Sequence, residues 1–207
     1  ESTGGGLSLR EAMRTRQFWT ICAICLVVIF CVHTVIIHIT PHAIDLGTST
    51  TNAASILSII GGISIIGRLV MGTASDKIGV RLVLVACSVL LLIALLWLQL
   101  ADRLWMLYLF AGIYGFAHGG FFTIISPAIA RVFGTRSQGT IFGIVLFSGT
   151  IGGAIGPILT GHIFDITNSY QISFLILAGL SIVSLILSTS LRPIAIKGGT
   201  NESRSSA

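Results

Sequence analysis

The sequence predicts an all-α integral membrane protein, a bundle of six transmembrane helices. Hydrophobic residues make up 54% of the 207-residue chain and charged residues only 9%, and the mean hydropathy is +0.98. A soluble domain carries about 25% charged residues, so lipid must be the solvent for most of this chain. The apolar residues form long continuous runs of about 20 residues, the length of helix that crosses a bilayer core. Strands of a membrane barrel would instead alternate apolar and polar residues.

The six spans follow one another along the chain with short connections. We place them at residues 18–39, 52–71, 82–101, 105–130, 140–161 and 171–191. Residues 1–17 are predicted to form a cytoplasmic linker, in which Leu7 to Gln17 can form a short amphipathic helix on the membrane surface. Residues 192–207 are predicted to form a cytoplasmic tail. Because the chain opens on the polar stretch Glu1 to Gly6 with no initiator Met, we expect it to be part of a longer protein.

The distribution of Lys and Arg orients the spans. Of the twelve basic residues, only Arg103 falls on one side of the membrane, and the other eleven lie in or beside segments on the opposite side. Basic residues are retained on the cytoplasmic side, so both ends of this chain are predicted to be cytoplasmic. The plasma membrane is the expected location. Trp19 and Trp105, near span ends, fit the preference of aromatic side chains for the membrane interface.

Glycines within the second, fourth and fifth spans predict close packing of the helices. Without a side chain, glycine lets helix backbones approach one another in lipid. Packing alone would explain these residues, and the same faces could also slide between two states. The glycines are Gly61, Gly62 and Gly67 in the second span, Gly112, Gly115, Gly119 and Gly120 in the fourth, and Gly149, Gly152, Gly153 and Gly156 in the fifth.

The connection between the second and third spans carries the most specific motif. Its sequence, Gly72-Thr73-Ala74-Ser75-Asp76-Lys77-Ile78-Gly79-Val80-Arg81, fits G-x-x-x-D-[KR]-x-G-x-[KR]. Gly79 permits the tight turn of a short connection, and Gly72 leaves room for a neighbouring helix. Asp76 can lie against a helix N-terminus, for which the start of the fifth span is the candidate, or it can pair with Lys77 and Arg81.

This motif, together with the six spans and their orientation, resembles the major facilitator superfamily. The resemblance covers roughly residues 7–193, and Gly156-Pro157 with Phe164-Asp165 is similar to the monocarboxylate-transporter-like branch. It implies that the chain is the C-terminal half of a twelve-helix fold and that a second six-helix half completes it. The motif residues Gly72, Asp76, Lys77, Gly79 and Arg81 would then form a gate, with Asp76 clamping the cytoplasmic helix ends. A purely structural role for this connection is the alternative.

Arg68 is the first candidate for substrate binding. It lies within the last turns of the predicted second span, where a charge is costly and therefore suggests a function. The monocarboxylate-transporter family has an Arg at the matching place, implicated in binding the substrate carboxylate, and a guanidinium suits that role because it can donate two parallel hydrogen bonds. The family's Asp one turn earlier is replaced here by Ser64, which puts proton coupling through that residue in doubt. The alternative is an Arg that extends to the cytoplasmic surface.

His118, His33 and Tyr114 are the other candidates for the substrate site. By the resemblance, the first and fourth helices of each half line the central cavity, where an imidazole can bind an anion or carry a proton. For His118 and His33 the alternative is a histidine that bonds a backbone carbonyl in a helix interface. For Tyr114, as for Phe122, the alternative is packing, because aromatic residues at helical spacing commonly pack.

The implied function is secondary transport of a small organic anion, with a monocarboxylate as the leading class and proton coupling left open. A drug or metabolite exporter of the same superfamily is an alternative. An intramembrane enzyme is disfavoured because Ser148-Gly149 lacks the expected G-x-S-G pattern. We expect no cofactor, no metal site and no nucleic-acid partner, because the basic residues are dispersed and the cysteines lie inside apolar runs. His38 and His42 are four residues apart, but Pro41 is predicted to interrupt the helix between them.

Overall fold

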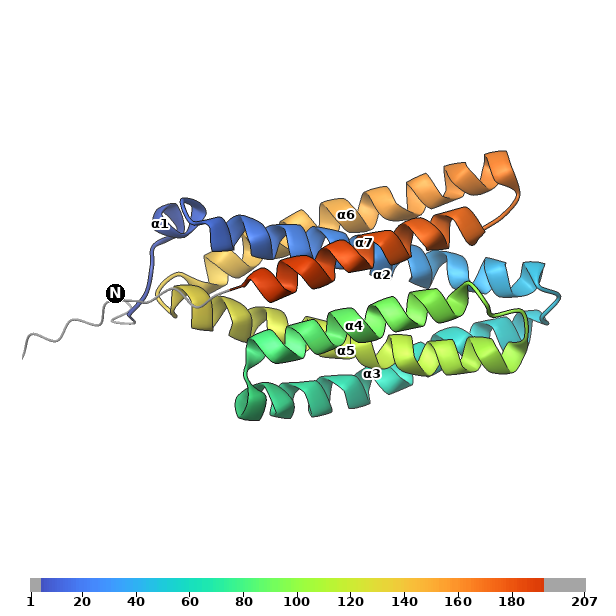
Figure 1. Ribbon diagram of the computed structural model, residues 1–207, viewed down its shortest axis with the longest axis horizontal. Coiled ribbons are helices and arrows are strands. Elements are labelled where there is room, and N and C mark those ends of the chain that lie inside the picture. Colours follow the sequence, from blue (N-terminus) through green and yellow to red (C-terminus); the bar gives the residue numbers. More distant parts are fainter. Residues whose placement is uncertain (1–4, 192–207) are drawn as a thin grey trace, which may run out of the picture.

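The computed structural model describes residues 5–191, and within this range the chain is helical apart from short turns and one isolated β-bridge. Six of the seven helices, α2 to α7, are long and apolar enough to cross a membrane, which confirms the predicted count of spans. They run alongside one another in an elongated bundle (Figure 1). The predicted tail 192–207 lies outside the described residues. The helices are α1 (Leu9–Met13), α2 (Arg16–Asp45), α3 (Thr50–Ile78), α4 (Val80–Leu98), α5 (Leu104–Phe133), α6 (Gln138–Thr167) and α7 (Gln171–Ser190).

Most of the spanning helices extend beyond the predicted apolar runs. α2 passes Pro41 and ends only at Asp45, so the predicted interruption is wrong. Proline removes one backbone donor, but in a long packed helix the neighbouring turns hold the helix together. α6 continues to Thr167 and ends on Asn168, whose φ of 50° is left-handed, a conformation that asparagine adopts more readily than most residues.

The linker before the first span contains a helix shorter than predicted. α1 begins with a capping box, in which the Ser8 hydroxyl accepts from the Glu11 backbone and the Glu11 carboxylate accepts from the Ser8 backbone at 2.7 Å. These hydrogen bonds hold the pKa of Glu11 below its ordinary value. Just before α1, the Leu7 N–H donates to the carbonyl of Phe133 at 2.8 Å. The linker is therefore fastened to the α5–α6 turn.

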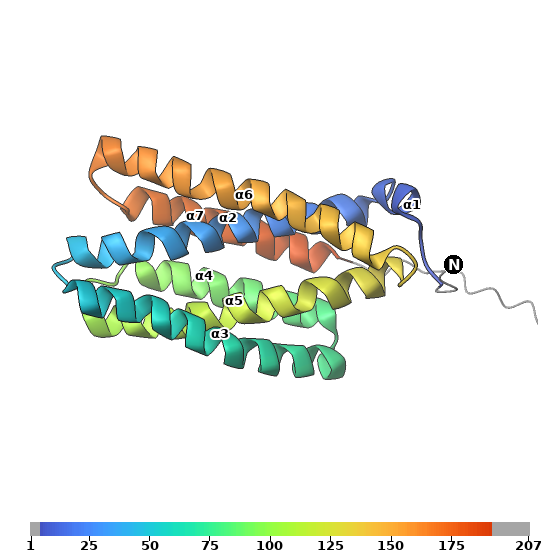
Figure 2. The same cartoon turned by 180° about the vertical axis from the view of Figure 1, so that it is seen from behind.

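The helix contacts reveal an internal repeat. α3 packs most extensively on α5 and α2 on α6, followed by the pairs α4–α5, α4–α7 and α2–α7. Exchanging α2 with α5, α3 with α6 and α4 with α7 converts each of these pairs into another of the set or into itself. Because successive helices run in opposite directions, the two three-helix units have inverted topology, a common architecture among transporters. Figure 2 shows the α2–α6 and α3–α5 pairs from the opposite side.

Glycines on all three predicted helices form the closest helix contacts, and on α3 this is Gly67, which meets the Phe116 backbone of α5. On α5, a Cβ atom at Gly115 would lie 2.6 Å from the Ile60 carbonyl oxygen of α3, and one at Gly119 would overlap the Ser64 carbonyl. On α6, Gly152 and Gly156 have the same four-residue spacing, and a Cβ at either would lie under 3.0 Å from a backbone carbonyl of α2. This is the small-xxx-small packing of membrane helices.

The structure also limits the packing prediction. Gly61 and Gly62 on α3 and Gly112 on α5 have nothing within 4 Å of a built Cβ atom. These three glycines are not used for packing among the described residues, so the prediction of close packing there stays open for contacts outside this chain.

Candidate functional site

Three polar side chains from three helices share one region in the middle of the bundle. His33 lies on α2, Arg68 on α3 and His118 on α5, each at least ten residues, about 15 Å, from either end of its helix. The helices meet beside these residues: Gly67, next to Arg68, packs against the backbone of Phe116 on α5, and Val32, next to His33, lines a small cavity together with His118. Substrate sites of inverted-repeat transporters lie at the same depth, near the bilayer midplane.

Arg68 is deeper in its helix than the sequence indicates. The predicted second span ends at residue 71, but α3 continues to Ile78. The Arg68 side chain is exposed, and it forms no hydrogen bond or ion pair with another residue of the range 5–191. It stands among exposed apolar side chains of the same helix, Ile65, Ile66, Leu69 and Val70. A lone guanidinium on such a face is available to an anion.

His33 is exposed and held in a defined orientation. Its Nδ1 lies 3.2 Å from the carbonyl oxygen of Ile29, and its ring lies against Gly153 of α6, where a Cβ atom would be only 3.1 Å from Cγ. Because a carbonyl oxygen only accepts, the neutral ring carries its proton on Nδ1. Nε2 is then left as the atom that can meet a ligand or take up a proton.

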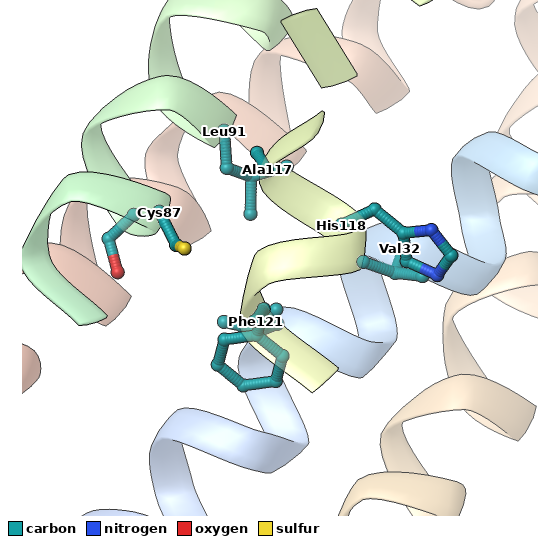
Figure 3. A pocket seen from close by; sticks show the side chains of 8 residues that line it. Val32, Cys87, Leu91, Ala117, His118 and Phe121 are labelled. Atoms are coloured by element: carbon teal, nitrogen blue, oxygen red, sulfur yellow. The ribbon is translucent and has the colours of Figure 1, made fainter. Parts of the chain in front are cut away.

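His118 is half-buried in an aromatic row on α5. Its ring stacks on Tyr114 with the centroids 6.1 Å apart and the planes at 8°, and it meets the edge of Phe122 at 5.2 Å. Its Nδ1 is buried without a hydrogen-bond partner. Figure 3 shows the imidazole beside Val32 of α2 and pointing away from Cys87 of α4. The cavity behind it, about 10 Å³, has room for about one water molecule.

Tyr114 is a packing residue in this geometry. Its side chain is fully buried, its hydroxyl donates to the carbonyl of Val32 at 2.9 Å, and its ring stacks on Phe110. In this conformation the hydroxyl is therefore taken up by a helix contact, and a direct contact with a substrate stays a prediction. Tyr114 joins α5 to α2 and supports the ring of His118.

The motif Gly72–Arg81 is mostly helical rather than a loop. α3 runs through Asp76 to Ile78, and only Gly79, with φ of 90°, separates it from α4, as the need for a tight turn predicts. A Cβ atom at Gly72 would lie 3.2 Å from Cγ2 of Thr123 on α5, so this glycine does leave room for a neighbouring helix. The Arg81 side chain extends to α7, where its guanidinium donates a hydrogen bond to the carbonyl of Thr189.

Asp76 and Lys77 are exposed. No hydrogen bond or ion pair joins Asp76 to Lys77, Arg81 or the start of α6 within residues 5–191. The charge pairing that the sequence permits is therefore not formed in this conformation.

No group of three or more His, Cys, Asp or Glu side chains that could hold a metal ion occurs in the described part of the chain. His38 and His42 lie on one face of α2, and both rings contact Tyr170. His38 Nε2 also lies 3.0 Å from the carbonyl of Pro157. The four cysteines are buried and free.

Arg131 is one of the basic residues whose distribution orients the spans, and the structure gives it a defined place. Its Nη1 lies 3.8 Å from the position of a Cβ atom at Gly79, so it lies over the turn of the motif. The sequence feature that could have identified it is a basic residue in the last turn of the span that packs beside this motif.

The chain is similar over most of its length to known transporters. The family model of the Major Facilitator Superfamily matches residues 20–205. Human monocarboxylate transporter 12 is 28% identical over 151 residues, which cover 71% of this chain and 29% of the relative. The riboflavin transporter MCH5 of Saccharomyces cerevisiae is 30% identical over 144 residues, 68% of this chain and 27% of the relative. The matched region thus spans less than a third of the length of these two relatives.

A solved structure agrees with this fold. The crystal structure of the nucleoside transporter NupG matches with a TM-score of 0.72 at 16% identity, over 92% of this chain and 48% of that one. The bundle therefore corresponds to one half of that fold, and the relatives favour a transporter over an intramembrane enzyme. The chain belongs to the major facilitator superfamily and is similar to monocarboxylate transporters within it.

Proposed function

We propose that this chain is the C-terminal half of a secondary transporter that carries a small organic anion, with monocarboxylates as the leading class. The observation that carries the proposal is Arg68, an exposed guanidinium near the middle of a spanning helix. His33 and His118 lie in the middle turns of the neighbouring helices α2 and α5, and an imidazole, like a guanidinium, can carry positive charge. A site with this composition attracts a carboxylate.

The face around Arg68 supports a second half as the missing partner. In the apolar 18-residue stretch of α3 that can cross the membrane, only 22% is buried inside this chain, whereas the share for α2 is 61%. An Arg exposed to lipid at the bilayer centre costs about 2.5–3.5 kcal/mol or more. A second six-helix unit packed on this face would enclose Arg68 in a polar cavity and remove that cost. Rocking of the two halves around the cavity is the alternating-access mechanism that we infer.

Any proton coupling is proposed to use histidine. The position of the family's acidic residue is occupied by Ser64, whose hydroxyl donates to the carbonyl of Gly61 at 2.7 Å. Ser64 is thus a helix-packing residue with no proton to exchange near neutral pH. The free Nε2 of His33 and the imidazole of His118 are the groups beside Arg68 that can take up a proton.

A second candidate substrate class is a planar metabolite, favoured by the similarity to the yeast riboflavin transporter. The half-buried rings of His118 and Phe122 would offer such a substrate a stacking surface. The two classes differ in what they require, because a carboxylate needs the guanidinium and a flavin ring needs the aromatic surface.

The full-length protein should take up a labelled short monocarboxylate saturably when expressed in cells. The matched test compound is the uncharged amide of the same acid, which lacks the anionic oxygens that Arg68 would bind. We expect the acid to compete with the label and the amide to fail at the same concentration. Uptake of labelled riboflavin without uptake of any carboxylate would refute the anion proposal.

Asp76→Asn in the full-length protein should lower the transport rate about tenfold with normal abundance in the membrane. Under the gating proposal, the Asp76 carboxylate forms charge-assisted hydrogen bonds in only one of the two states, and each is worth about 1.5–3 kcal/mol. The amide keeps the shape and loses the charge. Exchange rates should be compared with those of Asp102→Asn, an exposed acidic residue in the opposite connection. Equal transport rates for the two variants would contradict gating by Asp76 and would indicate that the motif has only a structural role.

We also propose that the end of the bundle that carries the motif faces the cytoplasm and that the protein resides in the plasma membrane. The support is the distribution of basic residues: Arg81, Arg131 and Arg136 lie at the end where α3 ends and α6 begins, whereas Arg103 precedes α5 at the other end.

A further inference from the structure

A pocket of about 230 Å³ opens where α4 begins, at the end of the bundle that carries the motif. Its walls come from the start of α4, the last turns of α5 and Leu191 after α7. Two of its lining residues are charged, Arg81 and Arg131, and both are basic. The remaining wall is largely apolar and includes Val80, Leu84 and Val132. The pocket thus combines two guanidinium groups with an apolar surface.

The electrostatics of the pocket favour an anion. Arg131 lies over the Gly79 turn, with Nη1 3.8 Å from the position of a Cβ atom there. Arg81 follows two residues later, and one of its nitrogens donates to the Thr189 carbonyl, which leaves its other N–H groups for a ligand. The N-terminus of α4 has no side-chain cap, so its first amide groups add partial positive charge. Neither guanidinium has an acidic partner within residues 5–191.

The apolar wall and the position of the pocket identify the kind of anion. The volume is smaller than the roughly 300–1,000 Å³ of sites for whole drug-sized ligands, and it suits a charged headgroup. Next to the pocket, Ile78 and Leu82 are 54% and 58% exposed, as expected for side chains in contact with lipid. A free phosphate would gain nothing from Leu84 and Val132, whereas an acyl chain would gain burial.

We propose that this pocket binds an anionic phospholipid, with the headgroup phosphate between Arg81 and Arg131 and an acyl chain along the Leu84–Val132 wall. Basic pockets between spanning helices are suited to such headgroups, and anionic lipids are enriched in the cytoplasmic leaflet, which this end of the bundle is proposed to face. The site is separate from that of Arg68, because it lies at the end of the helices between α4, α5 and α7. The segment that follows Leu191 has three basic residues and one acidic residue, so its charge does not complement the pocket.

The proposal can be tested by lipid retention, without a transport assay. The purified full-length protein would be exchanged into mixed micelles of phosphatidylglycerol and phosphatidylcholine, and the bound lipid would be counted by native mass spectrometry. We expect selective retention of phosphatidylglycerol, and Arg131→Gln should lower it on the order of fivefold, the factor for one basic residue at an anionic surface. Arg136→Gln is the matched control, because Arg136 is exposed near the same end and does not line the pocket.

A second variant and a second ligand complete the test. Arg81→Gln should also lower retention, but this variant loses the hydrogen bond to α7. If it does not fold, the result for Arg131→Gln alone tests the proposal. Equal retention by the Arg131 and Arg136 variants would overturn the site. If inorganic phosphate at millimolar concentration displaced the lipid completely, the pocket would be a phosphate site without a lipid component, which also contradicts the proposal. Because lipid binding is the readout, failure here leaves the proposed transport function untouched.

Discussion

Gly119→Ala should destabilise the folded bundle by about 3 kcal/mol or more, at the upper end of the usual cost of overpacking. The single methyl group would overlap the backbone carbonyl of Ser64 and approach its Cα atom to 2.8 Å. These atoms belong to helix backbone and cannot turn aside as a side chain could, so α3 and α5 must separate along their length. The α3–α5 pair is one of the two most extensive contacts of the fold.

The matched control is Gly179→Ala on α7. Gly179 is exposed, and a Cβ atom added to it would have no neighbouring atom within 4 Å. Alanine has a higher helix propensity than glycine by about 1 kcal/mol, so this variant should be as stable as the parent or slightly more stable. Thermal unfolding of the purified full-length variants in detergent would measure both effects. If Gly119→Ala unfolded at the same temperature as Gly179→Ala, the close approach of α3 and α5 would be wrong.

The contrast between these two glycines also shows what the sequence can predict. Composition and the length of the apolar runs are sufficient for the six spans, because the bilayer imposes a minimum length on each helix. The helix ends are not predictable in the same way, since a helix can continue into water, as α3 does through Asp76 to Ile78. A glycine face predicts close packing but does not identify the glycines that pack. Gly115 contacts α3, whereas Gly112 on the same helix does not.

The candidate site was predictable one residue at a time. A charge or an imidazole inside an apolar run identifies Arg68, His33 and His118 individually. Their proximity depends on how α2, α3 and α5 pack, which no local pattern encodes. The role of Tyr114 depends on the Val32 carbonyl, 82 positions away in the chain, so the sequence could not decide between packing and substrate contact.

Arg68→Lys in the full-length protein should reduce carboxylate uptake on the order of a hundredfold in kcat/KM. The substitution keeps the positive charge, so the attraction of an anion into the cavity persists. It removes the planar pair of N–H groups that can grip both carboxylate oxygens, and a hydrogen bond to a charged group is worth about 1.5–3 kcal/mol. Uptake at several substrate concentrations, normalised to the surface abundance of each variant, would measure the loss. Arg103→Lys, in the opposite connection and exposed, should leave uptake unchanged.

This comparison separates binding from snorkelling, because a lysine extends to the membrane surface as readily as an arginine. If Arg68 served only to reach the cytoplasm, its lysine variant would transport normally and match the Arg103 variant. Arg68 lies roughly two turns before Asp76, where α3 continues into water, so its position is compatible with either role and the lysine variant decides between them. Gly67, next to Arg68, packs against the backbone of Phe116, two residues before His118 on α5, as expected beside a site shared by the two helices. Full uptake by Arg68→Lys would therefore refute carboxylate binding by Arg68 while leaving the fold and its family intact.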